Sequence, residues 1–344
     1  MSIALYRKHR PQHFDDVVGQ DAVIQNLQNS IKDGSLSHAY LFTGSRGTGK
    51  TSIARILAQE IGTSANDLYE IDAASNRGID DVRALRESVQ SLPFESKYKV
   101  YIIDEVHMLT KEAFNALLKT LEEPPQHVIF ILATTEFHKI PDTIISRCEV
   151  HHFMRPTAHT LKNYILSVAS KEGYEVEAGA VDLIALLGDG SFRDTLGALQ
   201  KIITSIDQHT LTLETVESLT GVPAQSFIRS LLEALHKKEI GQALTLLQGI
   251  NLSHHNSKIL SSLLITHIRY VLLLRFAQDM NTMIQDEVGE DMYTFLMTLA
   301  KAENTGISSL LLKNILISSA TLEYSAIPTL PIELAVIETL REEK

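Results

Sequence analysis

The sequence predicts an α/β domain with a mostly parallel sheet and helices on both faces, followed by two helical domains. Short apolar runs alternate with helical patterns up to about residue 153, which is typical of a parallel sheet with crossover helices. From about residue 156 onward the apolar residues recur at helical spacing, with almost no strand candidates. We therefore expect three domains, at 1–155, 156–222 and 223–344.

The elements of the first domain follow from the positions of its apolar runs. Short continuous runs of this kind are typical of strands buried on both faces. They predict strands at 39–42, 68–71, 100–103, 128–133 and 150–153. Helices are expected between them, at about 21–32, 50–61, 79–90 and 111–121. In the helical half, glycine-containing turns at 188–190 and 221–223 separate the predicted helical segments.

The composition excludes several classes of protein. With 344 residues, 44% of them apolar and 21% charged, the chain resembles an ordinary globular protein and not a disordered or fibrous one. Its net charge of −11 excludes a uniformly basic surface, so any DNA contact must use a locally basic face. One cysteine, Cys148, cannot close an internal disulfide, which favours a reducing compartment. The apolar region 259–276 contains His267, Arg269 and Arg275 and fits a buried helix, so we expect a cytoplasmic protein.

Residues 44–51 match the phosphate-loop pattern G-x-x-x-x-G-K-[ST], after a predicted strand and before a predicted helix. The glycines let backbone N–H groups surround the phosphates, and the helix amino end favours their charge. Lys50 is expected to reach the β- and γ-phosphates and the Thr51 hydroxyl to bind Mg²⁺. A chance glycine-rich turn is the alternative, which the flanking strand and helix disfavour. The expected nucleotide-binding residues here are Gly44, Ser45, Arg46, Gly47, Thr48, Gly49, Lys50, Thr51 and Ser52.

An acidic pair follows the apolar run 100–103. Asp104 is expected to hold Mg²⁺ and Glu105 to polarise the attacking water. Taken alone, such a pair is also typical of a solvated strand end, but with the phosphate loop it predicts ATP hydrolysis. Thr135, Arg147 and Arg193 are weaker candidates, because strand-end threonines and lone arginines are common on protein surfaces.

These motifs, in this order, resemble the AAA+ ATPases and, more closely, the γ/τ subunits of the bacterial DNA polymerase III clamp loader. The resemblance covers about 1–222 and is most specific at Asp-Glu-Val-His, Leu-Glu-Glu-Pro-Pro and Ser-Arg-Cys. The segments that carry it are 6–11, 14–20, 38–42, 70–76, 103–109, 114–125 and 146–148.

The resemblance implies roles for several residues. Arg147 would be the arginine finger that acts on ATP held by the neighbouring subunit, Thr135 would be sensor 1 and Arg193 sensor 2. A further group would line the adenine and ribose pocket: Arg10, Pro11 and Val18. The helical domains would be the lid and the collar of the family.

The resemblance also implies partners. Leu92 and Phe94 would contact the sliding clamp, the β subunit. The alternative interpretation is that their loop folds onto the core of its own domain. Ser75, Asn76 and Arg77 would contact primer–template DNA without sequence preference. The alternative interpretation is that they form only a helix cap and turn. The chain would join δ- and δ′-type subunits in a ring-like heteropentamer in the cytoplasm, associated with the nucleoid and not with a membrane.

The sequence departs from the family in two places. The interval 61–69 lacks the four cysteines of the family's zinc module, so no structural zinc is expected. The sequence ends at residue 344, which resembles the short γ form and not the τ form with its long tail.

Three other functions fit the sequence less well. A catalytically inactive scaffold subunit is disfavoured because the ATPase motifs are complete. A branch-migration motor is the main alternative, but 223–344 shows no strand pair of a winged helix. A protein-remodelling chaperone would need an aromatic pore loop, which the sequence does not show clearly.

Overall fold

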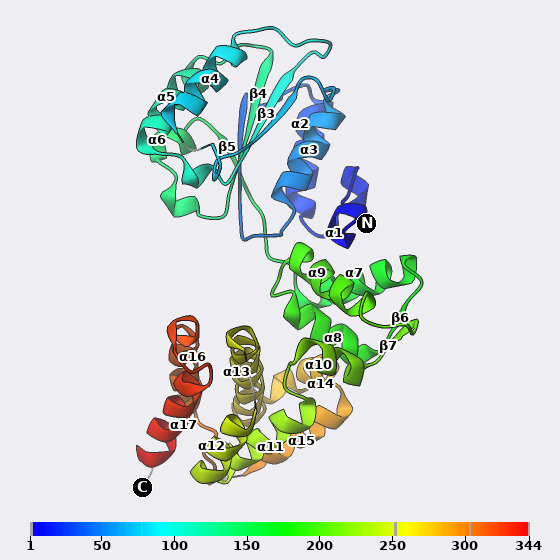
Figure 1. Ribbon diagram of the computed structural model, residues 1–344, viewed down its shortest axis with the longest axis vertical. Helices are drawn as coiled ribbons and strands as arrows, with labels where there is room; N and C mark the ends of the chain where they lie inside the picture. Colours follow the sequence, from blue (N-terminus) through cyan, green and yellow to red (C-terminus); the bar gives the residue numbers. More distant parts are fainter. Residues whose placement is uncertain (1–2, 77, 251–252, 303, 343–344) are drawn as a thin grey trace. The chain divides into compact units, whose positions relative to one another are not determined.

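The computed structural model describes residues 3–76, 78–250, 253–302 and 304–342. The chain forms two compact units, Met1–Leu211 and Thr212–Lys344 (Figure 1). The helix α10 (Leu213–Thr220), which the sequence placed at the end of the second domain, lies in the second unit. The finer division of the first unit at residue 155 stays a prediction.

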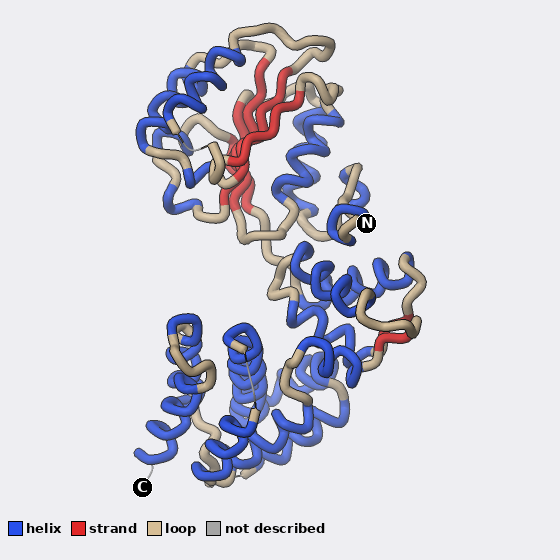
Figure 2. The backbone as a smooth tube through the Cα atoms, viewed as in Figure 1, coloured by secondary structure: helices blue, strands red, loops and turns tan. Residues whose placement is uncertain are grey.

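The first unit contains a parallel sheet, the larger group of red strands in Figure 2. Its five strands lie in the order β2-β3-β4-β1-β5. All five predicted strands are present. Their bounds are β1 (Ala39–Thr43), β2 (Leu68–Asp72), β3 (Lys99–Asp104), β4 (Val128–Thr134) and β5 (Glu149–His152). The carboxyl ends of β1, β3 and β4 are therefore adjacent, and in open α/β sheets ligands bind at such an edge.

Alternating side chains bury both faces of this sheet. In β1, Ala39 and Leu41 pack into one core, and Tyr40 and Phe42 into the other. The first core is closed by α4 (Ile79–Val89), α5 (Lys111–Glu122) and α6 (Asp142–Ile145), and the second by α2 (Asp21–Lys32) and α3 (Lys50–Glu60) (Figure 1). The prediction of helices on both faces is confirmed.

The remainder of the first unit is a small helical group beside the sheet domain. It comprises α7 (Ala158–Lys171), α8 (Ala178–Leu187), α9 (Phe192–Ile203) and the two-stranded pairing of β6 (Glu175–Val176) with β7 (Thr210–Leu211). The short α1 (Leu5–Lys8) joins this group, since the Leu5 amide donates to Gln200 Oε1 at 2.9 Å. The sequence did not predict α1, β6 or β7, because two to four residues carry no readable periodicity.

Many helices begin where a Ser or Thr side chain accepts a backbone N–H of the first turn, which stabilises a helix by about 1 kcal/mol. These N-caps are Thr110, Thr157, Ser191, Thr212, Ser253 and Ser308. Short 3₁₀ turns lie at Phe14–Asp16, Val106–Met108, Phe137–Lys139, Gln278–Met280 and Leu322–Tyr324.

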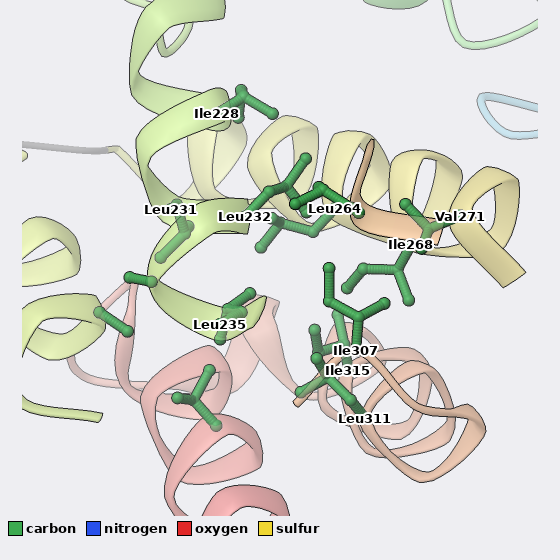
Figure 3. Close-up of a cluster of buried hydrophobic side chains, with 14 of the residues drawn as sticks. Ile228, Leu231, Leu232, Leu235, Leu264, Ile268, Val271, Ile307, Leu311 and Ile315 are labelled. Carbon is green, nitrogen blue, oxygen red and sulfur yellow. The ribbon is translucent and has the colours of Figure 1, made fainter. Parts of the chain in front are cut away.

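The described residues of the second unit form helices joined by loops, with no strand among them, and the unit has its own apolar core (Figure 3). Besides α10 it contains α11 (Gln225–His236), α12 (Ile240–Gly249), α13 (His254–Phe276), α14 (Asn281–Val288), α15 (Glu290–Lys301), α16 (Ser309–Ser319) and α17 (Leu330–Glu342). By length and composition alone, α13 could cross a membrane over Asn256–Phe276. Its residues Leu264, Ile268 and Val271 are buried in this core, as expected for a central helix of a globular bundle.

Candidate active site

The phosphate loop connects β1 to α3, and its glycines adopt backbone conformations that favour glycine. The φ angles of Gly44, Gly47 and Gly49 are +151°, +74° and +103°. A Cβ at Gly47 would lie 1.9 Å from Ser191 Oγ, whereas a Cβ at Gly49 would have no heavy atom within 4 Å. Gly49 is also the N-cap of α3 and provides no side chain to its first turn. The amino end of α3 therefore keeps N–H groups for an anion beside open space.

Lys50 lies deep in this loop. The residue is 6% exposed, and its Nζ donates to the carbonyl oxygens of Gly44 at 2.7 Å and Ser45 at 2.9 Å. Burial lowers the pKa of Lys50, and the charges of Glu105 and Asp104 act in the opposite direction. The ammonium group is thus held in the loop by fixed carbonyls, with two carboxylates nearby.

The acidic pair lies at the end of β3, beside the phosphate loop. Thr51 Oγ1 donates to Asp104 Oδ2 at 2.8 Å, so the two predicted Mg²⁺ ligands are in direct contact. Glu105 has φ +49°, a left-handed conformation that is strained for a residue other than glycine. Thr135 Oγ1, just after β4, donates to Glu105 Oε2 at 2.9 Å. The structure therefore brings all four residues together.

A cavity of about 890 Å³ opens over these groups. Its size is at the upper end of the usual range for small-molecule sites, about 300–1,000 Å³. The predicted residues that line it are Arg10, Pro11, Val18, Arg46, Gly47, Thr48, Gly49, Lys50, Thr51, Ser52, Asp104, Glu105 and Arg193. Arg10 Nε donates to Ser52 Oγ at 3.0 Å, and the Arg193 guanidinium lies 5.1 Å from the centre of the Tyr6 ring. Burial, followed by the charge of Arg55, lowers the pKa of Arg10.

Two contacts at the site were not predicted from the sequence. His107, whose side chain is 6% exposed, lies 3.0 Å from Thr134 Oγ1 and 3.4 Å from carboxylate oxygens of both Glu105 and Glu136. The Phe192 amide donates to the carbonyl of Gly47 at 3.0 Å, which joins α9 to the phosphate loop. The contacts of His107 with Thr134 and Glu136, and that of Phe192 with Gly47, link segments far apart in sequence, and neither residue type signals such a partner.

Arg147 is not among the residues lining this cavity. It follows α6, and its guanidinium donates to Glu122 Oε1 at 2.6 Å and to the carbonyl of Thr143 at 2.8 Å. It lines a separate surface hollow with Ser37, His38, Leu121, Glu122, Ser146, Cys148 and Glu149. The structure therefore does not bring Arg147 to the phosphate loop of its own chain.

The described residues that are expected at macromolecular contacts are exposed. Leu92 and Phe94 are 77% and 81% exposed, so they do not fold onto the core of their own unit. Ser75 and Asn76 close a turn on Asp72, with Ser75 Oγ donating to Asp72 Oδ2 at 2.8 Å and Asn76 Nδ2 to the Asp72 carbonyl at 3.0 Å. Arg77 lies outside the described residues.

Comparisons with known proteins agree with this architecture. A family model described as DNA polymerase III, delta subunit, matches residues 19–74 and 62–157. The Holliday junction branch migration motor RuvB of Thermotoga maritima has a TM-score of 0.53 at 24% identity, covering 66% of this chain and 79% of RuvB. That likeness concerns the fold alone.

Curated relatives are more similar in sequence. The DNA polymerase III subunit gamma of Buchnera aphidicola is 38% identical over 273 residues, 73% of this chain and 74% of the relative. The subunit tau of Bacillus subtilis is 42% identical over 303 residues, 82% of this chain and 54% of the relative. The subunit tau of Escherichia coli is 42% identical over 252 residues, 67% of this chain and 39% of the relative. The chain thus spans about half the length of the first of these tau subunits, and less of the second.

The sheet order, the phosphate loop and the acidic strand end define a P-loop protein of the AAA+ ATPase class. The sequence similarity, which extends over most of the Buchnera subunit gamma, identifies the family within this class. The chain belongs to the gamma/tau family of DNA polymerase III subunits.

Proposed function

We propose that this chain is an ATPase subunit of the replicative clamp loader of the DNA polymerase III holoenzyme. ATP binding would open the sliding clamp, and hydrolysis triggered by primer–template DNA would release it. The observation that carries this proposal is a cavity that joins the phosphate loop to the acidic pair, while Arg147 lies on a separate surface. Family membership supports the proposal.

The residues at the cavity fit a magnesium–nucleotide complex. Thr51 Oγ1 and Asp104 Oδ2 are hard oxygen donors 2.8 Å apart, at the mouth of a loop that can cradle phosphates. We assign Thr51 and Asp104 to Mg²⁺, which when bound neutralises developing charge on the phosphate oxygens.

The other side chains divide the remaining work. Lys50 and the loop N–H groups bind the phosphates, and Arg193 approaches them from the helical group. Glu105 polarises the attacking water, and its contact with Thr135 orients its carboxylate. The adenine and ribose are assigned to a pocket formed by Arg10, Pro11 and Val18.

We assign Arg147 to the ATP of a neighbouring subunit. Its position in a separate hollow supports action in trans, because the finger and the phosphate loop of one chain do not share a cavity. Nucleotide state would then control the packing between subunits in a heteropentamer with δ- and δ′-type subunits. The three-domain division, with a lid at 156–222 and a collar at 223–344, belongs to this proposal.

Two surfaces are assigned to macromolecules. The exposed Leu92 and Phe94 would anchor in an apolar groove of the sliding clamp. Ser75, Asn76 and Arg77 would contact DNA phosphates without sequence preference, in a salt-sensitive manner. The protein would act in the cytosol, at the nucleoid during replication.

We also propose that the segment 61–69 replaces a zinc module without binding zinc. It contains no cysteine, and a closed structural site needs about four ligands of the thiolate or imidazole type. Metal analysis of the purified protein by mass spectrometry would contradict this proposal if it found one equivalent of zinc.

The test of the function is steady-state ATP hydrolysis by the chain reconstituted with its partner subunits, with and without sliding clamp and primed DNA. Strong stimulation that requires both would support clamp loading, and a Lys50→Ala variant in the same assembly is the control for contaminating ATPases. Turnover that is indifferent to the clamp would refute clamp loading and favour a branch-migration motor or a protein-remodelling ATPase.

A further inference from the structure

The loop between α4 and β3 presents its apolar side chains outward. Leu92 and Phe94 are among the most exposed large apolar residues of the chain, at 77% and 81%, and Pro93 lies between them. A flexible loop would tend to fold such side chains against nearby apolar surface, because exposing them to water is unfavourable. The outward orientation of these side chains therefore requires contacts that fix the backbone of the loop.

Asp67 holds the second half of the loop. The residue is 1% exposed, and its carboxylate accepts the backbone N–H groups of Phe94, Glu95 (3.0 Å) and Ser96 (2.8 Å). Burial alone would raise the pKa of Asp67, but the three N–H groups outweigh it and hold this pKa well below its usual value. The carboxylate is thus ionised and fully engaged with the loop backbone.

Two neighbours of Asp67 add to this anchor. The Ser64 amide donates to Ser96 Oγ at 2.7 Å, and Asn66 Nδ2 donates to Glu95 Oε1 at 3.2 Å. All three anchoring residues lie in the short segment 61–69 and precede the first residue of β2, Leu68.

The first half of the loop is fixed independently. The ammonium group of the buried Lys99 donates to Ser91 Oγ at 2.8 Å, and His127 Nε2 lies 3.1 Å from the carbonyl of Ser91. The apolar tip between Ser91 and Glu95 is therefore held at both ends while its two large side chains remain in solvent.

We propose that Asp67 is a positioning residue that holds the loop 92–96 in the conformation that docks into an apolar groove of the sliding clamp. This inference rests on the clamp contact proposed above. A preformed loop avoids the entropy cost that ordering a mobile segment would add to binding. The segment 61–69 is thus a structural support of the docking loop.

The test uses the full chain in its reconstituted assembly and compares three variants with the unmodified protein. Asp67→Asn keeps the size of the side chain but removes its charge and one acceptor oxygen. Leu92→Ala/Phe94→Ala removes the anchors themselves. Asp207→Asn, at an exposed position of the same unit, is the matched control.

We expect Asp67→Asn to speed hydrogen exchange at the amides of 94–96 but not in α3. The clamp concentration for half-maximal ATPase stimulation should rise by about 10–100-fold, the loss expected from ordering one or two residues. The maximal stimulated rate and the clamp-free rate should not change. A merely structural defect would instead lower the maximal stimulated rate and the clamp-free rate.

The outcomes separate the two proposals. If Leu92→Ala/Phe94→Ala weakens clamp stimulation while Asp67→Asn does not, the positioning role is wrong and the clamp contact stands. If neither does, the clamp contact itself is wrong. Should Asp67→Asn fail to fold, Ser96→Ala removes the contact with Ser64 and should shift the clamp requirement in the same direction; an unchanged requirement would overturn the inference.

Discussion

Replacing Arg147 with alanine should separate turnover from folding and from ATP binding. The Arg147 side chain is 33% exposed, and its partner Glu122 is 47% exposed. Exposed pairs of this kind contribute about 0–1 kcal/mol to stability, so the free energy of unfolding should change by less than about 1 kcal/mol. Arginine fingers, in contrast, contribute about 10³–10⁵ in rate, which equals about 4–7 kcal/mol of the activation barrier.

The assay is DNA- and clamp-stimulated ATP hydrolysis by the reconstituted assembly, with nucleotide affinity measured by a fluorescent ATP analogue. Arg229→Ala is the matched control, because Arg229 pairs with Asp291 at 2.6 Å and its side chain is 29% exposed. We expect Arg147→Ala to abolish stimulated turnover with ATP affinity nearly intact, and Arg229→Ala to retain turnover. Unchanged turnover in Arg147→Ala would refute the trans-acting role, and a parallel loss of ATP affinity would indicate a role within the same chain.

Three further predictions concern Gly47 in the phosphate loop, the buried carboxylate of Asp67 and the thiol of Cys148. Gly47→Ala should weaken ATP binding by about tenfold or more, since its Cβ would meet Ser191 Oγ at 1.9 Å; Gly34→Ala, with φ +66° and open space, should not, and equilibrium binding compares the two. Because the folded pKa of Asp67 is lowered, its contribution to stability is complete above the unfolded pKa of about 3.9 and is lost as pH falls toward the folded pKa. Urea unfolding should therefore show the unmodified protein more stable than Asp67→Asn at pH 7, and the difference in their free energies of unfolding should shrink below about pH 3.9. A difference that does not change with pH would contradict the stabilisation of the Asp67 carboxylate in the folded state. Burial raises the pKa of Cys148 to about 12, so at pH 8 a fraction of about 10⁻⁴ is thiolate and alkylation should be slow until urea unfolds the chain.

The sheet was predictable because its strands are continuous apolar runs bounded by turns, and the phosphate loop because its pattern is local in sequence. The lengths of α1, β6 and β7 are below what periodicity can reveal, and the boundary between the two units follows tertiary packing that no local signal marks.

The site was predictable only as a set of residue types. That Thr51 meets Asp104 and Thr135 meets Glu105 follows from adjacent strand ends, which the order of the sheet decides. That Arg147 meets Glu122 depends on the path of the chain between α5 and β5, and no spacing rule provides it. The segment 61–69 shows this limit most clearly, since the sequence indicated what it lacks and not that Asp67 anchors a distant loop.

The contacts around the cavity form a continuous physical link between the phosphate loop and the helical group. The Phe192 amide, at the start of α9, donates a hydrogen bond to the Gly47 carbonyl, and Arg193 of the same helix lies over the Tyr6 ring. Arg10 donates a hydrogen bond to Ser52 in α3. A nucleotide that shifted the phosphate loop would therefore displace α9 through backbone contact, without a mobile intermediary. Because packed interfaces of this kind change between discrete arrangements, bound phosphate and the position of the helical group should be coupled in both directions. This coupling is the property that a subunit needs if its nucleotide state is to control its neighbours in a ring.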